Sequence, residues 1–198
     1  MKKNKVIYHT ALKPELEISE KLDFFQNDGN VVLKHDITTG PHKYLFKCDV
    51  IYSEPAWLAG YQLFLNRAGA KHSQYYEFIQ IMSEMPDILK IPYFLIIGKH
   101  VFNKFNNYDL IKNITLNGSK AFLIGYNLYG IKIQIKDNMT NYEFIQLLSQ
   151  YYNCVGDFCC GYGNSGRIFK GNRKHFILSD INGKCIYYVA KELMDYAR

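Results

Sequence analysis

The chain has 198 residues, of which 48% are hydrophobic and 21% charged, and its formal net charge is +6. This length and composition are typical of one globular domain that buries a core. No apolar run is long enough to cross a bilayer, and the lysine-rich start leads into no signal-peptide core. We therefore expect a single domain over residues 1–198, without a membrane partner and in the cytoplasm.

The spacing of the cysteines and histidines argues against disulfide bonds and against a metal-binding site. The five cysteines include the adjacent pair Cys159 and Cys160 and no C-x-x-C pair, which fits neither a disulfide framework nor a zinc site. Reduced thiols packed as small apolar side chains are the better interpretation. The group His35, Asp36 and His42 has no common ligand spacing, so we expect loop residues and no metal.

The N-terminal part, residues 1–47, is the hardest to assign. Apolar side chains between Glu15 and Phe25 recur at a roughly helical spacing. The run 27–30 (Asn-Asp-Gly-Asn) is a turn signal, and residues 31–33 are a short candidate strand.

An apolar strand that begins near Cys48 ends in Glu54, Pro55 and the only tryptophan, Trp57. A carboxylate and nearby backbone carbonyls can accept hydrogen bonds from an exocyclic amine, while an aromatic face stacks on the base. The structural alternative is a strand end closed by a rigid turn, with Trp57 packed in the core.

Further elements follow from the apolar pattern. In chain order we expect a helix over 59–85 that is interrupted near Gly69, a buried parallel strand over 93–98, a hairpin formed by 121–125 and 131–135, a helix over 141–150 capped by Thr140 or Asn141, and a final helix over 184–197. This alternation predicts an α/β sheet covered by helices.

A glycine-rich turn dominates the C-terminal part. A short buried strand ends at Asp157, and Gly161, Gly163 and Gly166 follow it; Asp180 ends the next apolar run. The glycine spacing fits a dinucleotide site, with Asp180 near the expected position of the acid. It also fits an S-adenosylmethionine site, or a tight strand–helix turn that binds nothing.

Two features favour S-adenosylmethionine over a dinucleotide. Asp157 would face a pyrophosphate with like charge, whereas it suits the cationic ammonium of a methionine moiety, directly or through water. Only 18 residues follow Asp180, too few for the second half of a dinucleotide domain.

Basic residues cluster after the turn, at Arg167, Lys170, Arg173 and Lys174. A solvated helix–loop face and a patch that contacts phosphate are both compatible with this cluster. The net positive charge agrees with a polyanionic partner without requiring one.

Together these features resemble the permuted, β-class DNA amino-methyltransferases, which modify adenine N6 or cytosine N4. Their glycine motif usually reads D-P-F-C-G-S-G-T-T-G. The run 157–166 aligns with it without a gap and matches at the Asp, the second Cys and all three Gly. Residues 53–57 stand where the family has D-P-P-Y or D-P-P-W, and the helix 141–151 matches the element before the glycine motif. The catalytic motif precedes the cofactor motif by 100 residues, which is the permuted order.

The resemblance implies a Rossmann-like three-layer fold whose sheet is mostly parallel with an antiparallel hairpin strand. It implies S-adenosylmethionine as the cofactor, bound by Asp157, Phe158, Cys160, Gly161, Gly163 and Asp180, with Asp180 on the ribose hydroxyls. It also implies that a flipped base of DNA rather than RNA, most often an adenine, stacks on Trp57. Its N6 amine would then donate to Glu54 and to a carbonyl beside Pro55.

Two departures from the family motif open an alternative. Glu54 replaces the usual Asp, and Ala56 replaces the second proline. A catalytically impaired subunit that binds cofactor or nucleic acid as a scaffold is therefore the second interpretation. No sizeable target-recognition domain fits between the motifs, so sequence specificity would require a homodimer or a separate recognition subunit.

Overall fold

The computed structural model describes residues 18–57, 59–69, 75–116 and 119–196. The strands are β1 (Phe24–Asn27), β2 (Asn30–Lys34), β3 (Val50–Ser53), β4 (Tyr93–Ile97), β5 (Leu110–Leu116), β6 (Ser119–Tyr126), β7 (Met139–Thr140), β8 (Cys154–Asp157) and β9 (His175–Asp180). The α-helices are α2 (Ala59–Ala68), α3 (Tyr75–Leu89), α4 (Asn141–Tyr151), α5 (Asn164–Gly171) and α6 (Gly183–Leu193). Short 3-10 helices are η1 (Ile37–Thr39), η2 (Leu45–Lys47) and η4 (Lys99–Lys104).

The strands of the described part form one sheet in the order β1-β2-β9-β8-β3-β4-β6-β5-β7. Its centre, from β2 through β9, β8 and β3 to β4, is parallel throughout. On one side β6 runs antiparallel to both β4 and β5, and on the other β1 runs antiparallel to β2. The predicted mostly parallel α/β sheet with an antiparallel hairpin is therefore confirmed.

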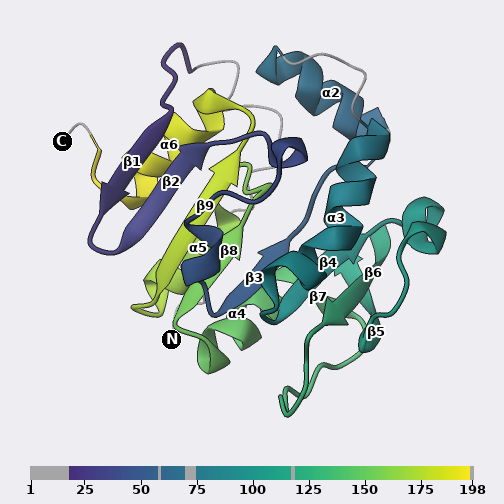
Figure 1. Ribbon diagram of the computed structural model, residues 1–198. Helices are drawn as coiled ribbons and strands as arrows, with labels where there is room; N and C mark the ends of the chain where they lie inside the picture. Colours follow the sequence, from purple (N-terminus) through teal and green to yellow (C-terminus); the bar gives the residue numbers. More distant parts are fainter. Residues whose placement is uncertain (1–17, 58, 70–74, 117–118, 197–198) are drawn as a thin grey trace.

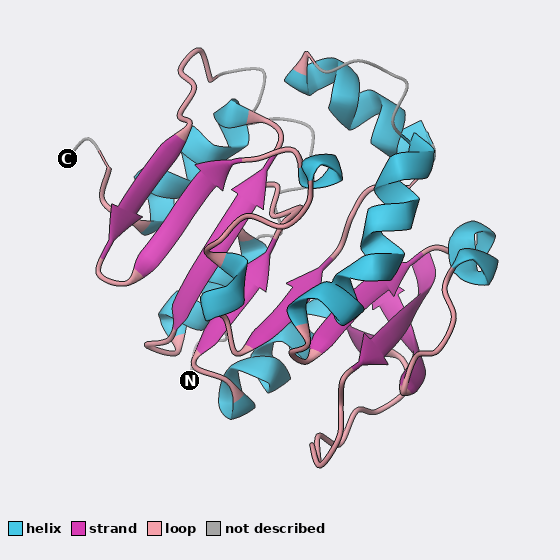
Figure 2. Cartoon of the chain, viewed as in Figure 1, coloured by secondary structure: helices cyan, strands magenta, loops and turns pink. Residues whose placement is uncertain are grey.

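Helices cover both faces of this sheet, which makes three layers (Figures 1 and 2). Helices α4, α5 and α6 bury their apolar side chains in a core on one face, which includes Phe144, Phe169 and Ile186. Helices α2 and α3, with η2, cover the other face over a core that includes Phe78 and Met82. Since both faces are covered, the central strand β4 is buried at every position, as its continuous apolar sequence predicts.

Several local predictions are confirmed. The long helical segment divides into α2 and α3 around Gly69, which has a φ of 72°. Thr140 caps α4 in a capping box, because its side chain accepts the Glu143 N–H while Glu143 reaches back to the Thr140 N–H. The five cysteines are free.

Two local predictions are wrong. Residues 131–135 form no strand; β6 pairs along its length with β5 instead. The Asn-Gly pair that separates β5 from β6 in the sequence is a strong hairpin signal, and the alternating isoleucines Ile133 and Ile135 only pack against the core. The helix expected up to Phe25 is also absent over residues 18–25, because Phe24 and Phe25 enter β1; residues 15–17 of that prediction lie outside the described residues.

The final helix is shorter than predicted. It ends at Leu193 rather than at residue 197, and Asp195 beyond it takes a positive φ of 57°. Within the described residues, no helix combines the length and the apolar character that crossing a membrane requires.

Candidate functional site

A cavity of about 500 Å³ opens at the carboxyl ends of the parallel strands. Acidic side chains reach it from four strand ends: Asp36 after β2, Glu54 after β3, Asp157 at the end of β8 and Asp180 at the end of β9. In open α/β sheets, ligands bind outside the carboxyl ends of the strands. This cavity is therefore the candidate site.

The glycine turn lines the cavity beside β8. Glycine is required at each of its three glycine positions for a different structural reason. Gly161 has a φ of 49°, lines the cavity, and a Cβ atom built on it would meet nothing within 4 Å. Its backbone is thus open to a ligand. Gly163 also has a positive φ, 73°, but its Cβ would meet Val189 of α6 at 3.0 Å. Gly166 allows α5 to approach β9, since its Cβ would lie 2.6 Å from Leu178.

Of the predicted cofactor residues, all but Gly163 line the cavity. Gly163 is the N-cap residue of α5 and lies against Val189 of α6, so its part in a site is to shape the turn. Phe158 is 2% exposed and its ring stacks on Tyr93 at 6.0 Å. The Cys160 N–H donates to the Ser179 carbonyl at 3.0 Å, which fixes the turn to β9.

Asp157 is buried and its carboxylate is already well supplied with donors. One oxygen accepts from the Ser53 hydroxyl at 3.2 Å and the Cys159 N–H at 3.1 Å; the other accepts from the Ser165 hydroxyl at 2.7 Å. Burial nevertheless raises the pKa of Asp157 to about 7, and the negative charge of Glu54 adds to this rise. The carboxyl thus changes its protonation state near neutral pH, and a cation in the cavity would favour its ionised form.

Asp180 ends β9 at the rim of the same cavity. One oxygen accepts the N–H of Gly161 at 3.0 Å and the other the N–H of Asn182 at 2.9 Å. This places the acid beside the glycine turn, as the spacing in the sequence predicts.

Glu54 faces the cavity from the end of β3 and stays partly exposed there. Its Oε2 atom accepts hydrogen bonds from the Tyr52 hydroxyl at 3.1 Å and from Asn141 Nδ2 at 2.7 Å. Burial raises the pKa of Glu54, and these two hydrogen bonds oppose the rise. The ionised form of Glu54 is therefore stabilised by two neutral hydrogen-bond donors.

Pro55 and Trp57 also line the cavity. The Trp57 indole N–H donates to the Ile96 carbonyl at 3.1 Å, and its ring contacts Phe78 and Phe105 at centroid distances of 5.7 and 5.8 Å. The indole is thus anchored to the core while it remains part of the cavity wall. The packing on Phe78 and Phe105 agrees with the structural interpretation of Trp57, while the stacking of a base on its ring stays a prediction.

Sequence reasoning missed several residues of the site. Asp36 lines the cavity, although its spacing to the neighbouring histidines indicated only a loop residue. Ser165, the second residue of α5, contacts Asp157, and Asn141, the first residue of α4, contacts Glu54. Both are polar side chains in the first turn of a helix, but nothing in the sequence shows that they point back to the strand tips.

His35 and His42 each have a hydrogen-bond partner within the protein. His35 binds the Gly40 carbonyl at 2.7 Å, and the buried His42 binds the Ser179 hydroxyl at 3.2 Å. Within the residues that the structure describes, no group of three or more His, Cys, Asp or Glu side chains is placed to hold a metal ion.

The basic cluster of Arg167, Lys170, Arg173 and Lys174 does not line the cavity. Arg173 and Lys174 precede β9, whereas Asp180 ends it, so they lie at the opposite edge of the parallel sheet. Lys170 donates to the Leu193 carbonyl, and Lys174 donates to Asn153 at 2.5 Å.

No protein family model matches the chain, and no curated protein matches its sequence. Solved structures do match its fold. M1.HpyAVI superposes with a TM-score of 0.56 both in a structure described as its complex with SAM and in a second structure, at 9% and 10% identity. Each superposition covers 82% of this chain and at least 97% of the other. A protein of Thermus thermophilus described as a putative DNA modification methylase superposes with a TM-score of 0.54 at 8% identity, covering 81% of this chain and 91% of that protein.

These comparisons define the class of fold. The chain has the three-layer α/β fold of these methyltransferases, and it matches nearly their whole length. The resemblance drawn from the two sequence motifs is thus confirmed at the level of the fold.

Proposed function

We propose that this protein is an S-adenosylmethionine-dependent methyltransferase that acts on an exocyclic amine of a nucleic acid, with adenine N6 in DNA as the acceptor. One observation carries the proposal. The glycine turn after β8, Asp180 after β9 and the run 54–57 after β3 come from distant parts of the sequence and line one cavity. A methyl donor and a methyl acceptor must lie side by side, and this cavity has a set of residues that fits each of them.

The residues on the β8–β9 side fit the cofactor. The open backbone at Gly161 allows close approach, and Asp180 offers a carboxylate to ribose hydroxyls beside it. The cavity volume of about 500 Å³ is within the range of small-molecule sites. Acidic side chains suit the sulfonium and ammonium charges of S-adenosylmethionine, whereas they would repel a pyrophosphate.

The residues on the β3 side fit an amine acceptor. When bound, the cofactor supplies an electrophilic methyl group, which the acceptor nitrogen takes as its N–C bond forms and the S–C bond breaks. Glu54 accepts an N–H of the acceptor amine, holds its nitrogen in line, and receives the proton that this nitrogen then loses. Trp57, anchored through Ile96, stacks on the base.

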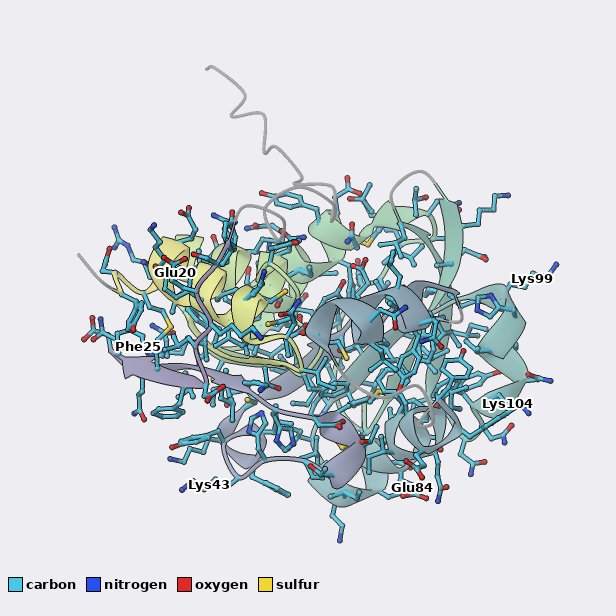
Figure 3. All side chains as sticks on the ribbon, turned by 90° about the horizontal axis from the view of Figure 1, so that it is seen from above. Glu20, Phe25, Lys43, Glu84, Lys99 and Lys104 are labelled. Carbon is cyan, nitrogen blue, oxygen red and sulfur yellow. The ribbon has the colours of Figure 1, made fainter. Side chains whose placement is uncertain are left out.

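The charge around the cavity supports a nucleic-acid acceptor. The helix η4 follows β4 at the cavity edge, where His100 lines the wall. Lys99 and Lys104 of η4 are exposed, and both project outward at one end of the molecule in Figure 3. Lys120, opposite Thr115 at the start of β6, adds a further exposed positive charge. An acidic cavity, together with exposed lysines on the neighbouring helix η4, suits a cationic cofactor and a phosphate-bearing acceptor.

Calorimetry with S-adenosylmethionine, followed by transfer of tritiated methyl groups to mixed DNA and RNA, tests the proposal. We expect saturable cofactor binding and label in DNA. Cofactor binding without transfer to any nucleic acid would favour the alternative of an impaired scaffold subunit. A protein that binds no S-adenosylmethionine would contradict the proposal.

A further inference from the structure

The carboxylate of Glu54 is held from two sides. Tyr52 lies two residues earlier, on the same face of the β3 end, and Asn141 is the first residue of α4. Both donate to the same oxygen, Oε2, at 3.1 and 2.7 Å. Among the residues that the structure describes, none donates a hydrogen bond to the other oxygen, Oε1.

The Asn141 amide has a defined orientation. Its Oδ1 accepts the N–H of Tyr142 at 3.0 Å, so its Nδ2 is the atom that faces Glu54. Asn141 is not needed to cap α4, because Thr140 and Glu143 form the capping box. At 6% exposure, its buried amide has the Glu54 carboxylate as its acceptor.

Tyr52 is equally constrained. It is 2% exposed, and its ring packs against Phe144 of α4 at 6.0 Å. Its hydroxyl thus reaches Glu54 from a fixed ring. The charge of Glu54 contributes to the raised pKa of Asp157, whose carboxylate is held by Ser53 and Ser165.

We infer that Tyr52 and Asn141 are positioning residues that hold Glu54 with a single oxygen, Oε1, available to accept an N–H from the methyl acceptor. This inference rests on the proposed function for the identity of the acceptor. It explains the departure from the family motif, since the extra methylene of Glu54 lets its carboxylate reach both donors. The class of acceptor that this site takes is an amine with an N–H to donate.

The titration of Glu54 tests the two hydrogen bonds without any need for activity. The carboxyl carbons of glutamate are labelled with carbon-13, and the Glu54 signal is assigned with Glu54→Gln. We expect Tyr52→Phe and Asn141→Leu each to raise the pKa of Glu54, since each removes a donor that stabilises the anion. Tyr126→Phe is the matched control, because the buried Tyr126 hydroxyl has no partner in the described part. An unchanged Glu54 titration in both test variants would overturn the inference.

A compensating pair tests the positioning itself. Glu54→Asp shortens the acid by one methylene, and we expect methyl transfer to fall by roughly a hundredfold, as for a displacement of about 1 Å. Adding Asn141→Gln lengthens the amide by one methylene, so the double variant should recover part of the lost kcat. The Kd for S-adenosylmethionine should change less than twofold throughout.

The outcomes separate this inference from the proposed function. If Asn141→Gln lowers kcat by the same factor in both backgrounds, the two residues act independently and the inference fails while the proposed function stands. If the wild-type protein transfers no methyl group, the proposed function fails and the Glu54 titration alone decides the inference.

Discussion

The backbone N–H of Gly161 donates a hydrogen bond to Oδ2 of Asp180 across 3.0 Å. This bond joins the turn after β8 to the tip of β9, and the N–H of Asn182 occupies the other Asp180 oxygen at 2.9 Å. One carboxylate therefore fixes the glycine turn and also faces the cavity. Its replacement should affect both the shape of the turn and its capacity to hold a ribose.

Asp180→Ala should weaken S-adenosylmethionine binding by about tenfold to a hundredfold, because charged hydrogen bonds contribute about 1.5–3 kcal/mol each. Asp180→Asn retains one acceptor oxygen and should fall between this variant and wild type. Calorimetric titration measures the Kd. The matched control is Asp23→Ala, whose carboxylate is 86% exposed and pairs only loosely with Lys34 at 3.8 Å. Wild-type affinity in Asp180→Ala would contradict the assignment of the ribose site.

The affinity for S-adenosylmethionine should depend on pH through Asp157. In the free protein its pKa is raised to about 7, so the carboxyl is protonated below that pH. A cationic ligand binds best to the ionised form, and binding below pH 7 must therefore release a proton. The Kd should fall by about tenfold for each pH unit up to 7 and then level off. Calorimetry in buffers of different ionisation enthalpy detects the released proton, and Asp157→Asn should abolish the dependence.

The same carboxyl affects stability in the free protein. Because its pKa in the folded state lies above its unfolded value, the folded protein binds more protons between about pH 4 and pH 7. The contribution of Asp157 to the free energy of unfolding therefore decreases as the pH rises through this window. Asp157→Asn should remove this contribution, which urea titrations at pH 5 and pH 7.5 would reveal.

Two glycines of α5 allow a controlled test of how this helix packs against β9. A Cβ at Gly166 would lie 2.6 Å from Leu178, whereas one at Gly171 would meet nothing within 4 Å. Gly166→Ala should lower the free energy of unfolding by about 1–3 kcal/mol through overpacking. Gly171→Ala should be neutral or raise it by about 0.5–1 kcal/mol. Equal effects of both substitutions in denaturant titrations would show that α5 does not pack against β9 as described.

Trp57→Ala should reduce kcat/KM for methyl transfer by roughly tenfold to a hundredfold, since the stacking of a base on an aromatic ring contributes about 1–3 kcal/mol. Trp57→Phe keeps a ring but loses the hydrogen bond to Ile96, so its loss should be smaller. Cofactor affinity should change little in either variant. Full activity of Trp57→Ala would refute base stacking at this site.

Binding to duplex DNA should be weak, with little sequence preference and a steep dependence on salt. Specific readout buries about 1,000 Å² or more, and the described elements between the two motifs belong to the sheet and its covering helices. Replacing Lys99 and Lys104 with Gln should reduce the slope of log K against log salt by about two. Replacing Arg173 and Lys174, which lie at the opposite edge of the sheet from the cavity, is the control and should matter less. Tight binding to one short DNA sequence that does not weaken with salt would contradict this prediction.

The sequence predicted those parts of the molecule whose signals are local. The apolar run of β4, the capping box at Thr140 and the glycine turn each specify their own backbone, and all three are present in the structure. The predicted hairpin is wrong because the alternation at 131–135 is also compatible with a loop, whereas the Asn-Gly pair after β5 is the stronger hairpin signal. Ile133 and Ile135 satisfy their burial by packing on the core without a strand partner.

The sequence predicted the site residues that belong to motifs. It did not predict the residues that reach the site through tertiary contacts. The strand tips at Glu54, Asp157 and Asp180 meet in one cavity, as their places in the sequence indicate. The Asn141–Glu54 contact joins residues 87 positions apart, and nothing local marks Asn141 as a partner. The raised pKa of Asp157 likewise depends on burial, which only the packed structure supplies.

The most direct test of the account is a nucleoside analysis of DNA after incubation with the protein and S-adenosylmethionine that carries a labelled methyl group. DNA isolated from a strain without adenine methylation serves as the acceptor, and the digested nucleosides are separated and counted. We predict that the label appears in N6-methyladenine and that Glu54→Gln abolishes it. Label in another nucleoside, or none in DNA while the protein binds the cofactor, would contradict it.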